Sequence, residues 1–84
     1  MNNEENIIRH VTHKLKTLPE YFEEVRKGNK KFELRYNDRN FKVGDLLVLQ
    51  EWDLEYTGRE LHRKIHYMLP EFSGLREGWV ILSI

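Results

Sequence analysis

The sequence predicts a single domain of the α+β class, in which about five strands around one α-helix form a small, mostly antiparallel β-barrel or half-barrel. Three observations support this expectation. The chain has 84 residues, enough for one small domain. One segment has the boundary residues of a helix. About five further segments have the alternating or continuous apolar pattern of strands, and with one helix they are typical of this architecture. Residues 1–84 are therefore expected to form one domain.

The composition limits the classes of protein to which the chain can belong. Lys plus Arg and Asp plus Glu number 14 each, so the net charge points to neither nucleic acid nor membrane, and any binding field must come from local clusters. The absence of cysteine fits a reducing compartment. No apolar run approaches the ~18 residues of a membrane span. The polar residues 1–6, expected to fray, lack the pattern of a signal peptide. We expect a cytoplasmic protein without membrane association.

A short strand is expected at residues 13–16, followed by the most clearly delimited element, a helix over residues 19–27. Thr17 has the spacing of an N-cap, with Glu20 three residues later as in a capping box. Pro19 begins the helix, and the N–H that proline lacks has no hydrogen-bond partner in the first turn of a helix. Gly28 is expected to end the helix in the left-handed conformation. The side chains predicted to be buried are Phe22 and Val25, with Tyr21 or Leu18.

The next segment, residues 31–36, alternates between apolar and charged residues, as a strand with two different faces does. The apolar set is Phe32, Leu34 and Tyr36, and the charged set is Lys31, Glu33 and Arg35. Charge at this density is unusual in a strand, which indicates a role other than folding. Residues 37–40 have the composition of a turn.

The second half of the chain is predicted to be mainly β. A nearly continuous apolar run is typical of a strand covered on both faces. Residues 60–69 fit a helix or a strand, and the strand is preferred because the segment follows a turn and lies between β-rich segments. The elements are a turn at 43–45, the apolar strand at 46–52, a turn at 56–59, the strand at 60–69, a loop at 70–78 and a final strand at 79–84.

The four histidines form two close pairs, which raises the question of a metal site. His10 and His13 are three residues apart, and His62 and His66 are four apart. On a helix His62 and His66 could share a metal, but on the preferred strand they lie about 13 Å apart, at ~3.3 Å per residue. No cysteine or carboxylate cluster completes a tetrahedral ligand set. Phosphate-binding glycine loops and a G-x-S-x-G elbow are also absent, so no metal or other cofactor is predicted.

A charged cluster is the candidate site, and its members are Lys30, Glu33, Arg35, Asp38 and Arg39. Glu33 and Arg35 lie two apart, hence on one face of a strand, where they can pair and hold the free N–H groups of Arg35 toward a phosphate or a base edge. Lys30, if desolvated, has the chemistry of a base or nucleophile. Alternatively, these are solvated charges on an exposed strand, whose ion pairs contribute little.

Gly28, Lys30, Glu33 and Arg35 stand at the offsets of the motif G-x-K-x-x-E-x-R, and the chain thereby resembles the ASCH domains, a branch of the PUA-like superfamily. Flanking segments extend the resemblance to a small bacterial and phage family of ASCH-type proteins of unknown function, over about residues 13–84. The segments are residues 13–16, 19–22, 37–41, 43–45 and 56–59.

The resemblance implies a PUA-like fold, a five- or six-stranded β-barrel with a helix closing one side and a cleft between them. Related domains are proposed to bind RNA or modified nucleotides in that cleft. By their position in the motif, Lys30, Glu33 and Arg35 would line it. The resemblance also implies rim positions for His13 and Lys16 on the first strand, Asp38 and Arg39 after the motif strand, and Tyr56, Thr57 and Arg59 from another loop.

The resemblance implies an enzymatic alternative as well. One small ASCH-type group hydrolyses the acetyl amide of acetylated cytidine with a lysine, a threonine and a glutamate. Lys30 matches the lysine, but Glu33 stands where that group has threonine, and its separate glutamate has no identified counterpart. A hydrolase of modified nucleosides is therefore the alternative, with Lys30 and Glu33 as its candidate catalytic residues.

We therefore expect a module that binds RNA or a nucleotide-like ligand, rather than an enzyme, and we assign no catalytic residue. A third hypothesis is a protein-interaction module that uses exposed aromatic side chains such as Trp52 or Trp79. The strand positions of these two tryptophans instead favour packing in the core. The sequence carries no signal for an oligomeric state.

Overall fold

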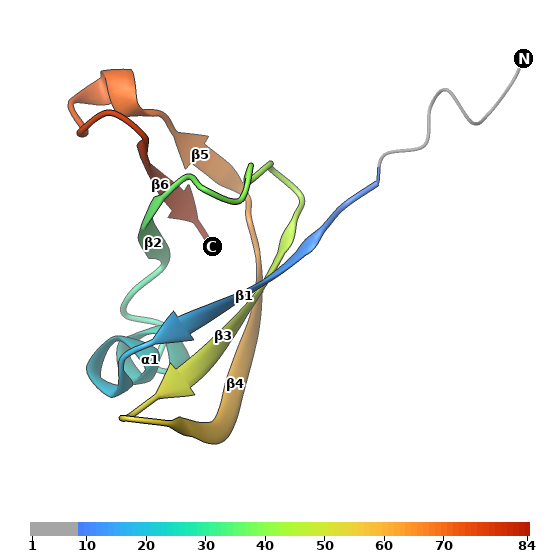
Figure 1. Ribbon diagram of the computed structural model, residues 1–84, viewed down its shortest axis with the longest axis vertical. Coiled ribbons are helices and arrows are strands. Elements are labelled where there is room, and N and C mark those ends of the chain that lie inside the picture. The colour runs from blue at the N-terminus through green and yellow to red at the C-terminus, as the bar shows by residue number, and fades with distance from the viewer. Residues whose placement is uncertain (1–8) are drawn as a thin grey trace, which may run out of the picture.

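The computed structural model describes residues 9–84 and contains one helix and six strands (Figure 1). The segment 1–6, predicted to fray, lies outside the described residues. The elements in chain order are β1 (Thr12–Thr17), α1 (Pro19–Arg26), β2 (Phe32–Tyr36), β3 (Leu46–Trp52), β4 (Tyr56–Lys64), β5 (Tyr67–Leu69), a 3-10 turn (Glu71–Ser73) and β6 (Trp79–Ser83).

The strands form two three-stranded sheets, which we call the β1–β3–β4 sheet and the β2–β6–β5 sheet. β1 runs parallel to β3, and the other three pairings are antiparallel. The chain passes from one sheet to the other between Lys64 and Tyr67, where β4 ends and β5 begins almost at once. The α+β class and the mostly antiparallel pairing are thus confirmed.

The two sheets do not join on the opposite side, between β1 and β2. Within residues 9–84 no backbone hydrogen bond connects these strands, so the hydrogen-bonded ladder does not close into a barrel. Side chains cross the gap instead. Arg35 Nη2 donates to the carbonyl oxygen of Lys16 at 3.0 Å, and Arg39 Nη1 donates to that of Lys14 at 2.7 Å. The arrangement is therefore an open pair of sheets.

The hydrophobic core lies between the two sheets, with Phe22 of α1 also fully buried. β3 is central to it, since Leu47, Val48 and Leu49 are all buried, which confirms the prediction of a strand covered on both faces. Leu82 of β6 is fully buried from the other side. The remaining buried apolar residues of the core are Leu15, Val25, Phe41, Ile65 and Val80.

The helix begins at Pro19 and ends just before Gly28 as predicted, but its N-terminal cap differs. Gly28 has a φ of +83°, its N–H donates to the carbonyl of Val25, and the N–H of Asn29 reaches that of Glu24. These two bonds define a Schellman motif. The predicted capping box is wrong, because Leu18 is the N-cap and no side chain caps the helix. Thr17 belongs to β1, where it is buried and its hydroxyl donates to a strand carbonyl.

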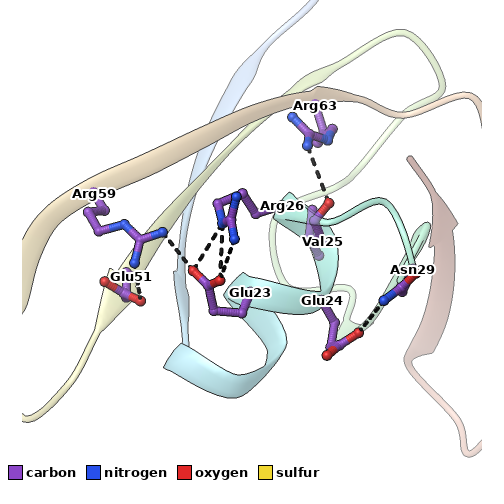
Figure 2. Close-up of polar contacts among 8 residues, drawn as sticks. All are labelled: Glu23, Glu24, Val25, Arg26, Asn29, Glu51, Arg59 and Arg63. Carbon is purple, nitrogen blue, oxygen red and sulfur yellow. Dashed lines mark hydrogen bonds and ion pairs between the residues drawn. The ribbon is translucent and has the colours of Figure 1, made fainter.

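The side of the helix that faces the β3–β4 hairpin is held there by ionic contacts (Figure 2). Arg59 reaches Glu23 of α1 at 2.6 Å and Glu51 of β3 at 3.5 Å. Arg26 also binds Glu23, and hydrogen bonds from Arg26 and Arg59 lower the pKa of Glu23 to about 2. Arg63 donates to the last-turn carbonyl of Val25. Phe22 and Val25 are buried as predicted, whereas Tyr21 and Leu18 are half exposed.

The turn predicted at residues 56–59 is wrong, because these residues begin β4. β3 continues through Trp52, which pairs directly with Tyr56, so the hairpin turns over residues 53–55. Leu54 takes the left-handed conformation there, with a φ of +65°. Residues 60–69 are strand as preferred, apart from the corner at 65–66. Among residues 9–84, no helix is both long and apolar enough to cross a membrane.

Candidate ligand-binding cleft

The alternation predicted for β2 is present, but Glu33 and Arg35 are on its more buried face, while Lys31, just before the strand, is exposed. The exposed fraction of Glu33 is 4%, whereas that of Phe32, Leu34 and Tyr36 is 46–54%. The register explains this inversion, since Glu33 lies opposite Leu82 on β6 and faces the interior with it. The interpretation of the motif residues as solvated charges on an exposed strand is therefore wrong for Glu33.

The motif residues converge on the Glu33 carboxylate. Lys30 Nζ lies 3.4 Å from Glu33 Oε2, and Arg35 Nε donates to the same oxygen at 3.3 Å. Lys30 also donates to the carbonyl of Phe32 at 2.6 Å. The second carboxylate oxygen, Glu33 Oε1, is buried without a hydrogen-bond partner. A buried carboxylate with an unused acceptor is costly for folding alone, so this group is a candidate for ligand recognition.

A cleft of about 460 Å³ opens beside this cluster, between α1 with the end of β1 on one side and β2 on the other. This volume is within the usual range of small-molecule sites. We call it the motif cleft. It is lined by Lys16, Thr17, Leu18, Tyr21, Lys30, Phe32, Glu33, Leu34 and Arg35.

A second cleft of about 400 Å³, here called the edge cleft, continues along the gap between β1 and β2. Lys16, Leu34 and Arg35 line both clefts, so the two are contiguous. Its further lining residues are Lys14, Leu15, Tyr36, Asp38, Arg39, Phe41, Tyr56 and Trp79.

The edge cleft combines cations with half-exposed aromatic rings. Lys16 Nζ lies 3.9 Å from the ring centre of Trp52 and 5.7 Å from that of Tyr56. Tyr36 and Trp79 meet edge to face with ring centres 5.9 Å apart. Flat apolar rings next to positive charge are suited to planar, anionic ligands.

Seven of the ten predicted site residues line the joined clefts: Lys16, Lys30, Glu33, Arg35, Asp38, Arg39 and Tyr56. Thr57 and Arg59 line neither cleft, because both bind Glu51 on the other face of the β1–β3–β4 sheet, the face toward α1. His13 is not a rim residue either. It is buried, and its Nε2 lies 2.8 Å from Oδ2 of Asp45.

Several cleft residues were not predicted from the sequence. Leu18, the N-cap of α1, and Tyr21 within α1 line the motif cleft, and Lys14, Phe41 and Trp79 line the edge cleft. A signal existed for Lys14, which shares the outward face of β1 with Lys16 two residues later. The exposed ring of Trp79 corrects the expectation that it packs in the core.

The histidines do not form a metal site within residues 9–84, where no group of three or more potential ligands comes together. His62 lies on β4 with Glu60 at 3.5 Å, and both side chains are largely exposed. His10 approaches Asp45 at 3.9 Å, on the same carboxylate that binds His13. Asp45 therefore has protein partners on both of its oxygens.

The fold and the site define a small α+β domain of two open sheets, with a charged and aromatic cleft along their unjoined edges. Residues 12–84 match the family model described as a domain of unknown function, DUF3850, and the chain belongs to this family. It is also similar to an uncharacterized 12.9 kDa protein in the GpA 3′ region of Escherichia phage P2. The two are 41% identical over 71 residues, 83% of this chain and 64% of that protein. The chain thus spans less than two thirds of the length of this relative.

Proposed function

We propose that this domain binds single-stranded RNA, or a nucleotide-like ligand derived from it, in the joined motif and edge clefts. The observation that carries the proposal is the buried Glu33, held between Lys30 and Arg35 with one oxygen unpaired. The resemblance of G-x-K-x-x-E-x-R to the motif of ASCH domains, whose relatives are proposed to bind RNA, supports the same assignment. In this proposal the domain is an open variant of the PUA-like barrel.

The chemistry of the motif cleft matches the two ends of a nucleotide. Glu33 lines the cleft, and its carboxylate can accept an N–H from the edge of a base, an interaction that a carboxylate provides well. Arg35 uses its Nε and one Nη in internal contacts and keeps further N–H groups for a phosphate. The side chain of Lys30 is 16% exposed at the cleft and adds a second cation.

The edge cleft has the features of a single-strand track. Lys14, Lys16 and Arg39 provide positive charge along β1 and the gap, although the chain as a whole is neutral. Tyr56 and Trp79 offer exposed rings, and base–aromatic stacking is worth about 1–3 kcal/mol per base. Local charge with interleaved aromatics is the pattern by which proteins bind unpaired nucleotides.

The proposal is tested by fluorescence anisotropy with labelled single-stranded and duplex RNA. We expect the single strand to bind more tightly, and its affinity to fall steeply as salt is raised. Lys30→Ala combined with Arg35→Ala should weaken binding by about tenfold or more, because both cations of the motif cleft are lost. The matched control is Lys27→Ala combined with Lys64→Ala, which removes the same charge from exposed positions outside the clefts.

Two results would contradict the proposal. One is no binding at low salt to either form of RNA by the folded wild-type protein. The other is an equal loss of affinity in the motif and control pairs, which would reduce the interaction to unspecific charge attraction.

A second candidate function, hydrolysis of a modified nucleoside, is favoured by one observation. The motif cleft brings together Thr17, Lys30 and Glu33, the three residue types used by the acetylcytidine amidohydrolase group. The threonine comes from β1 rather than from the motif strand. Chromatography of acetylated nucleosides incubated with the protein tests this, and Thr17→Val should abolish any turnover while Thr57→Val should not. Absence of turnover across the panel rejects the enzyme.

A further inference from the structure

The outward face of the β2–β6–β5 sheet is apolar across all three strands. Residues directly opposite each other in antiparallel strands point to the same side, so the register defines rows on this face. One row is Phe32, Ser83 and Tyr67, and the next is Leu34, Ile81 and Leu69. The sheet packs on the core through its other face, which leaves these rows toward the exterior.

Water reaches much of this face. The exposed fractions are 46% for Phe32, 48% for Leu34 and 61% for Tyr67. A third row, Tyr36 opposite Trp79, extends the surface. No charged residue is among the outward residues of β2, β5 and β6. The outward face of the β1–β3–β4 sheet, by contrast, includes Lys14 and Lys16 on β1 and several charged residues on β4.

We propose that the apolar face of the β2–β6–β5 sheet binds the same face of a second copy, so that the protein is a two-fold symmetric dimer. Each of the four aromatic side chains has a surface of about 150–250 Å², and roughly half of that surface is still accessible to water. Together with the aliphatic residues, the accessible apolar surface of the face is about 600 Å² per copy. This area is near the ~800 Å² that each partner buries in a standard interface, and it equals the upper limit for the largest apolar patch on a typical monomer.

Self-association is favoured over another partner by charge. The outward residues carry no charge of their own, and Lys30 Nζ, 4.8 Å from the ring centre of Phe32, is the charge that lies against them. A surface this apolar matches itself better than it matches an acidic or basic surface. The whole chain has a formal net charge of zero, so two copies do not repel each other. Two sheets facing each other at ~10 Å form an ordinary sandwich, and identical rows satisfy the self-complementarity of a two-fold interface. Phe32, Leu34, Tyr36 and Trp79 of this face also line the clefts, so a dimer formed through it covers part of the surface proposed for RNA.

The dimer is tested by sedimentation velocity of the full chain from low to high micromolar concentration. We expect a shift from monomer to dimer in the wild type. Tyr67→Lys should abolish the shift, because each copy would have to bury a charged side chain in an apolar interface. Leu54→Lys is the matched control, since Leu54 is 91% exposed in the β3–β4 turn, away from the face. Far-UV circular dichroism should be measured on both variants to check that they are folded.

Cross-linking gives a second readout, because the chain has no cysteine. Ser83→Cys places one thiol in the face, and Leu54→Cys places one in the turn. With a short bismaleimide we expect covalent dimers from Ser83→Cys to form faster, although the serine position is less exposed. A wild type that is monomeric at every concentration overturns the proposal. So does dimerisation that survives Tyr67→Lys, or faster cross-linking at residue 54. A wild type that is monomeric without RNA, together with a loss of RNA affinity in Tyr67→Lys, would assign the face to base binding instead.

Discussion

Residues 9–84 contain three buried carboxylates, and two of them, Asp45 and Glu33, are in opposite circumstances. Asp45, beside β1 and β3, has every oxygen occupied: Oδ1 accepts the N–H of Val11, and Oδ2 accepts that of Lys42 and lies 2.8 Å from His13 Nε2. Glu33, on β2, shares one oxygen between Lys30 and Arg35 and leaves the other without a partner. Full satisfaction is the mark of a structural group, and an unused buried acceptor marks a group available to a ligand. The comparison therefore separates a buried charge that stabilises the fold from one that is available for function.

The sharpest way to break this comparison is to remove each carboxylate, starting with the structural one. Asp45→Ala should lower the free energy of unfolding by about 3 kcal/mol, because His13 and two backbone N–H groups lose their acceptor in a buried place. Urea denaturation measures the loss, with the exposed Asp53→Ala as the control expected to change little. A loss for Asp45→Ala no greater than that for Asp53→Ala would remove Asp45 from the structural class.

A smaller effect is expected from acid, which neutralises Asp45 without removing it. Burial alone would raise the pKa of Asp45, but hydrogen bonds from His13 and from the N–H groups of Val11 and Lys42 outweigh it and hold the pKa below its ordinary value of 3.8. A carboxyl whose pKa is lowered by folding stabilises the protein above its unfolded pKa, and this stability is lost as the pH falls through the folded pKa. Unfolding by urea should therefore become easier below about pH 4.

The acid effect is attributed to Asp45 by a variant that cannot titrate at this position. Asp45→Asn should be less stable than the wild type at neutral pH and should lose less stability on acidification. If both proteins lose the same amount between neutral and acidic pH, other carboxyl groups cause the change.

The smallest change in stability is expected for Glu33→Gln. Glutamine has the same shape and keeps an oxygen that can accept from Arg35, and Lys30 and Arg35 stay partly exposed to water, so the free energy of unfolding should change by less than about 1 kcal/mol. RNA affinity should nevertheless fall about tenfold, because the amide holds Arg35 less firmly and presents a weaker acceptor. The two quantities are measured on the same preparation. A large loss of stability with unchanged affinity would place Glu33 with Asp45 as a structural group.

The local elements were predictable because their signals lie within a few residues. Gly28 ends the helix as a left-handed residue must, and the apolar run of β3 is covered on both faces. The errors have local causes too. Thr17 fits a capping box, but its place in β1 prevailed over that role, and Tyr56 was assigned to a turn because Gly58 follows it, although a glycine can also lie within a strand.

The site was only partly predictable, because its geometry depends on contacts between distant segments. The motif identified Lys30, Glu33 and Arg35, but which face of β2 is buried depends on its pairing with β6 at the far end of the chain. His13 was assigned to the rim on the motif resemblance, yet its partner Asp45 lies 32 residues later. Tyr21 and Trp79 were missed for the same reason, since a side chain lines a cleft only through the elements that face it.

The arginines that cross the gap between β1 and β2 have a consequence for solubility. β1 is an edge strand, and unpaired carbonyls on such an edge invite strands of other molecules to add to it. Arg35 and Arg39 occupy the carbonyls of Lys16 and Lys14, and their side chains stand where an added strand would lie. A phosphate that draws these guanidinium groups away would expose that edge, and so would their replacement by alanine. The open cleft and the protection of β1 against intermolecular strand addition thus depend on the same two residues.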